Sequence, residues 1–207
     1  NGLRDACDPT VTFDKSSTPR IITLDFGTVN CTANNGRQRR GRIHVSYTGH
    51  YRDEGTVITI TPENYYVNDN LLLGTKTITN MGLDGNGHPY FNVVVNGSLT
   101  AGDGSWTATH QAARVRTWIE GYATPDLSDD VYLITGGGSG VNRNGVPYTV
   151  NITNALRIPL SCGRITQGTV QITPTGRPVR TIDYGNGTCD GTFTVTVNGH
   201  TYTVTIG

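Results

Sequence analysis

Three oxygen-bearing side chains fall within one glycine-rich stretch near the C-terminus: Asp183, Asn186 and Asp190. Calcium accepts carboxylate, amide and backbone oxygens from loops of this kind. The alternative is a tight turn in which Asp and Asn side chains bond their own backbone. Calcium is the one cofactor that the sequence suggests, and this loop is its candidate metal site.

Four aromatic residues are candidates for ligand binding: Trp106, Trp118, Tyr65 and Tyr66. Exposed rings of this type can stack on the apolar faces of sugars. In a β protein, however, large aromatic side chains commonly fill the core. Both interpretations stay open at the level of sequence.

No pattern of residues points to catalysis. None of the five His lies in a recognisable nucleophile motif, and the run Gly138-Ser139-Gly140 lacks the spacing of a nucleophile elbow. A glycosidase needs two carboxylates that face each other across a cleft, and the chain has only Glu54, Glu63 and Glu120 besides its Asp residues. We therefore predict no catalytic residues and no enzyme, with a hydrolase as the least favoured alternative.

The four cysteines are Cys7, Cys31, Cys162 and Cys189. They form no Cys-x-x-Cys motif and have no His at zinc spacing, which favours disulfides over metal ligation or reduced thiols. Of the three pairings that four cysteines allow, we predict Cys7–Cys31 and Cys162–Cys189, because each pair brackets a short β-rich segment. Disulfides form in oxidising compartments, so the predicted location is extracellular or at the cell surface.

Composition excludes several classes of protein. The 207 residues carry 16 Lys+Arg and 16 Asp+Glu, and a pI near 7.1 argues against a nucleic-acid partner. No stretch approaches the roughly 18 apolar residues of a membrane helix, so no transmembrane segment is expected. Charged residues make up only 15% of the chain and Gly contributes 27, which favours strands joined by turns over a helical bundle.

Alternation of apolar and polar residues with a period of two predicts the strands. They are expected over residues 20–26, 42–47, 56–61, 90–99, 106–119, 131–135, 168–173, 179–184, 192–197 and 201–206. Asn198-Gly199 is a two-residue hairpin signal, and Asn144-Gly145 is a second. The predicted fold is all-β: one or more antiparallel β-sandwiches, Ig-like in general architecture, held by disulfides.

A weak internal repeat indicates two units. Residues 23–27 (TLDFG) precede Cys31, and residues 181–185 (TIDYG) precede Cys189. We predict a larger β-sandwich unit with insertions over residues 1–158 and a smaller β unit over 159–207. The alternative is one continuous sandwich.

The stretch from Arg180 to Asp190 (RTIDYGNGTCD), followed by TVTVNG, resembles a largely uncharacterised family of secreted or surface-anchored proteins of Bacteroidota. Residues 65–70 (YYVNDN), 74–79 (GTKTIT) and 142–145 (NRNG) are also similar to that family. The resemblance covers most of the chain. It implies an exported all-β protein and supplies no reaction.

A short β-prone arm follows Cys7, and its assembly residues are Thr10, Val11, Thr12 and Phe13. Such an arm could add a strand to a neighbour's sheet and propagate into a fibre, or pair within its own domain. The predicted function is a non-catalytic extracellular structural or adhesive protein, with self-association or surface glycans as partners. The alternative is a carbohydrate-binding module or adhesin that uses the aromatic residues.

Overall fold

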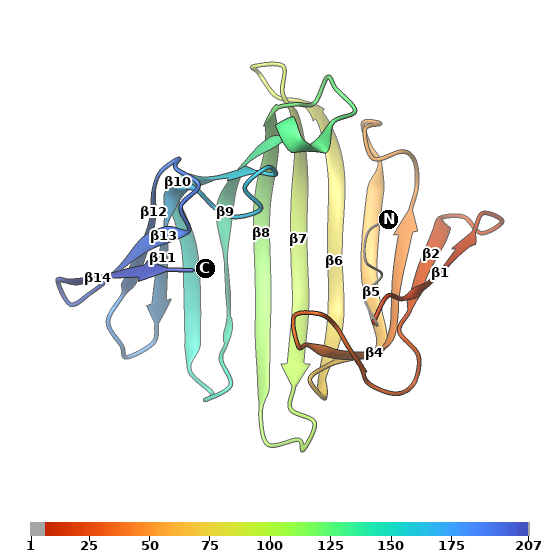
Figure 1. The fold of residues 1–207 in the computed structure, drawn as a ribbon, viewed down its shortest axis with the longest axis horizontal. Helices are drawn as coiled ribbons and strands as arrows, with labels where there is room; N and C mark the ends of the chain where they lie inside the picture. Colours follow the sequence, from red (N-terminus) through yellow and green to blue (C-terminus); the bar gives the residue numbers. More distant parts are fainter. Residues whose placement is uncertain (1–6, 207) are drawn as a thin grey trace.

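The structure, a computed structural model, describes residues 7–206 as fourteen β-strands and one short 3-10 helix (Figure 1). The strands are β1 Thr10–Asp14, β2 Arg20–Asp25, β3 Cys31–Thr32, β4 Gln38–Tyr47, β5 Val57–Val67, β6 Asn70–Leu83, β7 Pro89–Thr100, β8 Thr107–Glu120, β9 Val131–Val141, β10 Pro147–Pro159, β11 Gln167–Pro174, β12 Arg180–Asn186, β13 Thr192–Val197 and β14 His200–Thr205, and the helix is η1 Leu127–Asp129. The prediction of an all-β, antiparallel fold is confirmed.

All of these strands belong to one sheet. Each strand pairs with the next along the chain in antiparallel fashion, except that the two-residue β3 pairs with β4 beside the main path. The two packed sheets of an Ig-like sandwich are not confirmed by this strand order. The sheet also continues across the predicted domain boundary, because β10 pairs directly with β11.

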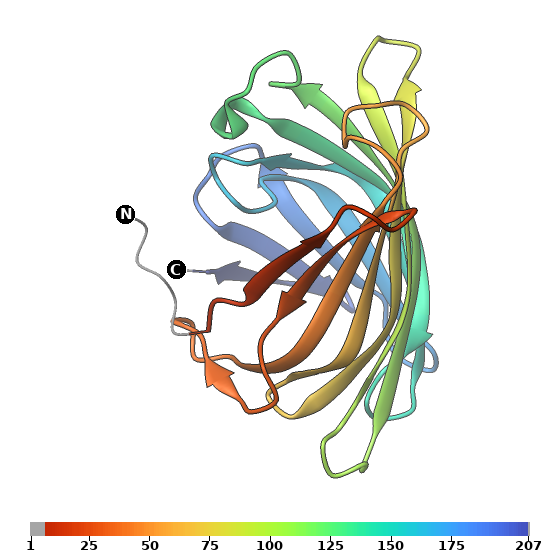
Figure 2. The ribbon, with the colours of Figure 1, turned by 90° about the vertical axis from the view of Figure 1, so that its right-hand side faces the viewer.

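The sheet is strongly curved. Figure 2 shows it from the side as an open trough, with a concave face on the left of the view and a convex face on the right. β-Bulges interrupt the register between β4 and β5, between β5 and β6, and on both sides of β10. Bulges bend and twist the strand that contains them, and open sheets of more than about 10 strands curl in any case.

The two faces of the sheet differ in chemistry. Cross-strand pairing aligns Ile58, Ile78 and Val93 on the concave side. Successive side chains of a strand point to opposite faces, so the residues between them lie on the convex side, where pairs such as Gln111 and Ser139 are polar. The alternation predicted from the sequence therefore gives an apolar concave face and a Thr- and Asn-rich convex face.

The hydrophobic core occupies one end of the concave face. It consists of the buried residues Ile78, Phe91, Trp118 and Tyr132. Two loops cover this end: Tyr51 stacks on Phe91 with ring centroids 4.8 Å apart, and Tyr122 meets the edge of the Trp118 ring. The remainder of the concave face has no second layer in the part of the chain that the structure describes (Figure 2).

Both predicted disulfides are present. Cys7 bonds to Cys31 and Cys162 bonds to Cys189, with sequence separations of 24 and 27 residues. Disulfides persist in oxidising environments, which agrees with a location outside the cytoplasm. No helix within residues 7–206 has the length and hydrophobicity needed to cross a membrane.

Candidate functional site

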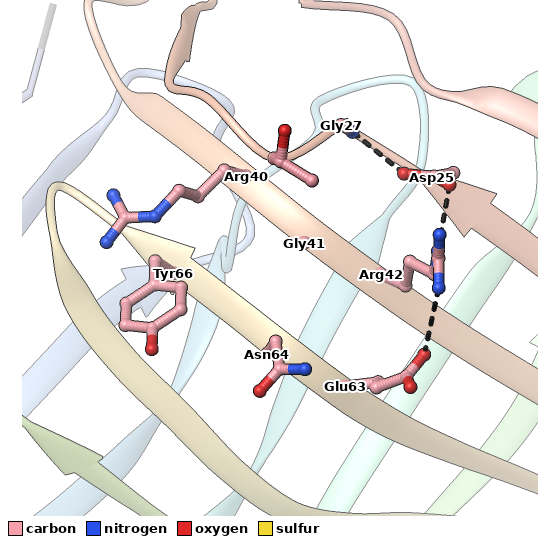
Figure 3. A pocket seen from close by; sticks show the side chains of 9 residues that line it. Asp25, Gly27, Arg40, Gly41, Arg42, Glu63, Asn64 and Tyr66 are labelled. Carbon is pink, nitrogen blue, oxygen red and sulfur yellow. Dashed lines mark hydrogen bonds and ion pairs between the residues drawn. The ribbon is translucent and has the colours of Figure 1, made fainter.

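A shallow pocket of about 200 Å³ lies on the convex side, over β4 and β5 (Figure 3). It is lined by Asp25, Gly27, Thr28, Arg40, Gly41, Arg42, Glu63, Asn64 and Tyr66. Drug-sized ligands usually occupy pockets of roughly 300–1,000 Å³. This pocket is therefore suited to a small polar group or to one unit of a larger ligand.

A bulge in β5 creates the pocket. The pairing steps from Arg40–Tyr66 to Arg42–Glu63, so β5 contains one extra residue at this point. Gly41 lies opposite with a φ of +92°, and a Cβ atom there would be 1.9 Å from the carbonyl oxygen of Asn64. Only glycine allows the two backbones to approach this closely.

Arg42 joins the two carboxylates of the pocket, as Figure 3 shows. Its Nε donates to Asp25 Oδ2 at 2.8 Å, and its Nη1 lies 3.7 Å from Glu63 Oε2. The Arg42 bond, followed by that from the Gly27 backbone N–H, lowers the pKa of Asp25. His44, through a 2.8 Å contact from Nε2 to Oε2, is the main cause of the lowered pKa of Glu63.

The same network continues through His44 to a hydroxyl. Thr23 Oγ1 lies 3.1 Å from His44 Nδ1, which gives the order hydroxyl, imidazole and carboxylate that activated nucleophiles use. Here, however, Glu63 is about half exposed (48%) and His44 is 36% exposed. Both carboxylates have lowered pKa values, whereas the acid of a glycosidase has a raised pKa. The arrangement is suited to binding hydroxyl or charged groups by hydrogen bonds.

The predicted aromatic residues do not come together. Trp118 and Tyr65 are buried, at 3% and 6% exposure, so their ring faces are not accessible to a sugar; both lie on the concave side, where apolar side chains pack. Tyr66 borders the pocket, but the guanidinium of Arg40 lies 3.9 Å above its ring. Trp106 is half-buried in the turn between β7 and β8. Of the four candidates, only Tyr66 belongs to the pocket.

The predicted calcium residues lie along a shallow depression beside β12 and β13. Each of them accepts a hydrogen bond from a backbone N–H two residues further on: Asp183 from Gly185, Asn186 from Thr188 and Asp190 from Thr192. These are the bonds of the alternative tight turn. Residues 7–206 contain no group of three or more His, Cys, Asp or Glu side chains placed to hold a metal. Calcium therefore stays a sequence-based prediction.

The N-terminal arm forms β1, the first edge strand of the sheet. It pairs with β2 of its own chain, from Thr10–Asp25 to Asp14–Ile21, as the second interpretation of the arm predicted. Within residues 7–206 no strand pairs with its other side, and all five of its residues are exposed. β14 is the opposite edge, and all six of its residues are exposed.

Sequence analysis did not identify the network of Thr23, Asp25, Arg42, His44 and Glu63. These residues come from three strands, and only the register of β2, β4 and β5 brings them together. Alternating polar positions in each strand were the one available signal, and many other strands carry the same signal.

No protein-family model matches the chain, and no similar protein was found among curated proteins or solved structures.

Proposed function

We propose that the protein is a non-catalytic, extracellular structural or adhesive protein that assembles through the two edges of its sheet. The observation that carries the proposal is that every residue of both edge strands, β1 and β14, is exposed. Each edge strand presents unpaired backbone N–H and C=O groups that can pair with another chain. The resemblance to secreted or surface-anchored proteins agrees with this role.

Two of the features that usually prevent such pairing are missing from both edge strands. Natural edge strands are often protected by Lys, Pro or bulges. β1 (TVTFD) and β14 (HTYTVT) contain neither Lys nor Pro. Both also carry exposed apolar residues, with Phe13 and Tyr202 each 60% exposed. Strand addition would bury these side chains together with the edge.

Strand direction limits how two copies can join. The path from β1 to β14 contains thirteen strands, fourteen less β3, and every step is antiparallel, so β1 and β14 run in the same direction. An antiparallel junction that keeps both concave faces on one side therefore pairs like edges: β14 with β14, and β1 with β1. Each junction has two-fold symmetry, and alternation of the two junctions propagates a fibre.

The β14 junction can be blocked by a single residue. The turn at Asn198-Gly199 has positive φ at both positions and closes on the pair Val197–His200, which is a hydrogen-bonded pair in two-residue hairpins. Bonding alternates along an antiparallel ladder, so Thr203 directs its N–H to the open edge. Thr203→Pro removes that donor without breaking the bonds to β13.

The test is size-exclusion chromatography and negative-stain electron microscopy of the purified full chain. We expect fibres from the wild type and from the control Thr203→Ala, which keeps the N–H. Thr203→Pro should leave dimers joined through β1, and adding Val11→Lys with Phe13→Lys should give monomers. Monomers from Thr203→Pro alone would show head-to-tail joining instead. A monomeric wild type under all conditions would overturn the proposal.

A carbohydrate-binding role is the second candidate, favoured by the hydrogen-bonding groups of the convex pocket. Asp25 and Glu63 are ionised acceptors, and Tyr66 adds a ring at the rim. A glycan array checks this role: binding lost in Asp25→Asn and in Tyr66→Ala, but kept in Asp183→Asn, would support it. The absence of any glycan bound by the wild type would exclude it.

A further inference from the structure

The open part of the concave face carries positive charge. Lys76 of β6 and Arg114 and Arg116 of β8 share the side of Ile78 and Val93 in the cross-strand register. Their neighbours on this side are aliphatic, such as Val95, which pairs with both Lys76 and Ala112. Three cations thus lie within an apolar surface.

The strands supply no carboxylate to this face, and the buried Asp130 at its covered end bonds to Trp118. The only carboxylates in strands β5 to β11 are Glu63 and Glu120. Glu63 contacts His44 and Arg42 on the convex side, and Glu120 pairs with Arg157. Among the described residues, Lys76 and Arg114 form no ion pair.

Arg116 and Arg114 differ in the hydrogen bonds and ring contacts that their guanidinium groups make. Arg116 donates to the Tyr51 hydroxyl, and its guanidinium lies 5.1 Å from the ring centroids of Phe91 and Tyr132. Arg116 therefore packs against the aromatic residues of the core. Arg114 has no such contacts. Among the described residues, the Nε atoms of both arginines are buried without a hydrogen-bond partner. Buried polar groups in native proteins usually have one.

The pKa of Lys76 also indicates that the three cations lie close together. Its pKa is lowered first by the loss of water around it and then by the charges of Arg116 and Arg114. The side chain is nevertheless exposed. The three cations are therefore close enough to repel one another, and an anion placed among them would relieve that repulsion.

The chain exposes more surface than a compact monomer of its size. The accessible surface is 12189 Å², whereas a compact monomer of 22.2 kDa exposes roughly 9,400 Å². Sheets with one apolar face bury that face against another layer, and permanent interfaces bury about 2,000–5,000 Å² in total. The difference of about 2,800 Å² on this one chain is larger than the half of such an interface that one partner contributes, because an open sheet also exposes its convex face and both edges.

We propose that the concave face docks an acidic polypeptide, an element with an apolar face whose carboxylates meet Lys76 and Arg114. Charge complementarity selects this occupant. A second copy placed face to face would set these cations against the same cations. An acidic glycan would satisfy the charges but would leave the aliphatic residues between them, such as Val95, without an apolar partner. The proposal concerns the face of the sheet and does not rest on assembly through its edges.

The experiment measures binding of two labelled synthetic peptides to the purified full chain by fluorescence anisotropy. Both are amphipathic helices with the same leucine stripe; one flanks the stripe with Glu and the other with Lys. We expect the Glu peptide to bind at least about tenfold more tightly than the Lys peptide. The double variant Lys76→Gln/Arg114→Gln should lose about tenfold or more of that affinity.

A matched control removes the same charge elsewhere. Arg143→Gln/Arg177→Gln changes two exposed loop residues and should bind the Glu peptide as the wild type does. A second site variant, Val95→Glu, supplies a carboxylate opposite Lys76 and should also weaken binding, which guards against a folding defect in the first. Equal binding of both peptides, an equal loss in the control, or displacement of the Glu peptide by dextran sulfate at comparable concentration would overturn the proposal.

Discussion

The indole N–H of Trp118 donates a hydrogen bond of 3.0 Å to Oδ1 of Asp130, a carboxylate that is only 1% exposed. The hydroxyl of Tyr132 lies 3.5 Å from the other carboxylate oxygen. Asp130 thus connects the end of β8, the start of β9 and the loop that covers the core. This contact holds together the one end of the concave face that has a complete core.

Asp130→Ala should lower the free energy of unfolding by about 2–3 kcal/mol, because the buried Trp118 N–H loses its acceptor. The measurement is urea denaturation followed by tryptophan fluorescence and circular dichroism. Asp129→Ala, the neighbouring exposed residue, is the control and should cost about 1 kcal/mol or less. Equal losses in both variants would contradict the role assigned to Asp130.

Gly41→Ala should destabilise the fold by more than about 3 kcal/mol, since its Cβ would overlap the backbone of Asn64. Gly36→Ala is a matched control: φ is +76° there, but no atom lies within 4 Å of the new Cβ. It should cost about 1–2 kcal/mol from backbone conformation alone. Denaturation midpoints of the two variants separate the clash from the φ effect. Similar values would show that the bulge opposite Gly41 relaxes without cost.

Replacing Cys162 and Cys189 with Ser should lower the unfolding free energy by about 3–4 kcal/mol, because the bridge closes a loop of 27 residues in the unfolded chain. Thermal unfolding with and without a reductant measures the effect. The reductant should still lower the melting temperature of this variant, through Cys7–Cys31. A double variant as stable as the wild type would show that native packing already fixes this loop.

The ion network of the convex pocket should contribute stability that depends on pH. The fold lowers the pKa of both Asp25 and Glu63, so their contribution is present above the ordinary carboxyl pKa of about 4. It is lost as pH falls through the lowered values. The difference in unfolding free energy between the wild type and Asp25→Asn/Glu63→Gln should therefore shrink between pH 6 and pH 3. A difference that does not change over this range would contradict the assigned pKa shifts.

Local patterns predicted much of the secondary structure. Residues 192–197 match β13, and Asn198-Gly199 forms the expected turn. β6 and β10 were not predicted as strands, because glycines in one and Pro and Asn residues in the other interrupt the alternation. These positions are bulges and close backbone approaches: Gly74, for example, has a φ of +119° and faces the backbone of Asn96.

The sequence predicted the candidate site residues less well than it predicted the strands. The disulfide pairing followed from spacing, since each bridge closes a short β-rich segment. Trp106 and Trp118 were expected at opposite ends of one strand, yet Trp118 lies in the core and Trp106 in a turn. Exposure depends on which loop folds over which residue, and the sequence pattern does not contain that information.

The sequence by itself determined an all-β chain with one apolar and one polar face per strand, and an oxidised set of cysteines, because alternation, turn residues and cysteine spacing are local properties. Only the tertiary structure decided that the strands form a single sheet, that Arg42 joins Asp25 to Glu63, and that Lys76 and Arg114 share a face on which neither forms an ion pair among the described residues. The physical reason is register. A period of two is the same in a sandwich and in an open sheet, and neighbours across strands depend on pairing between distant segments.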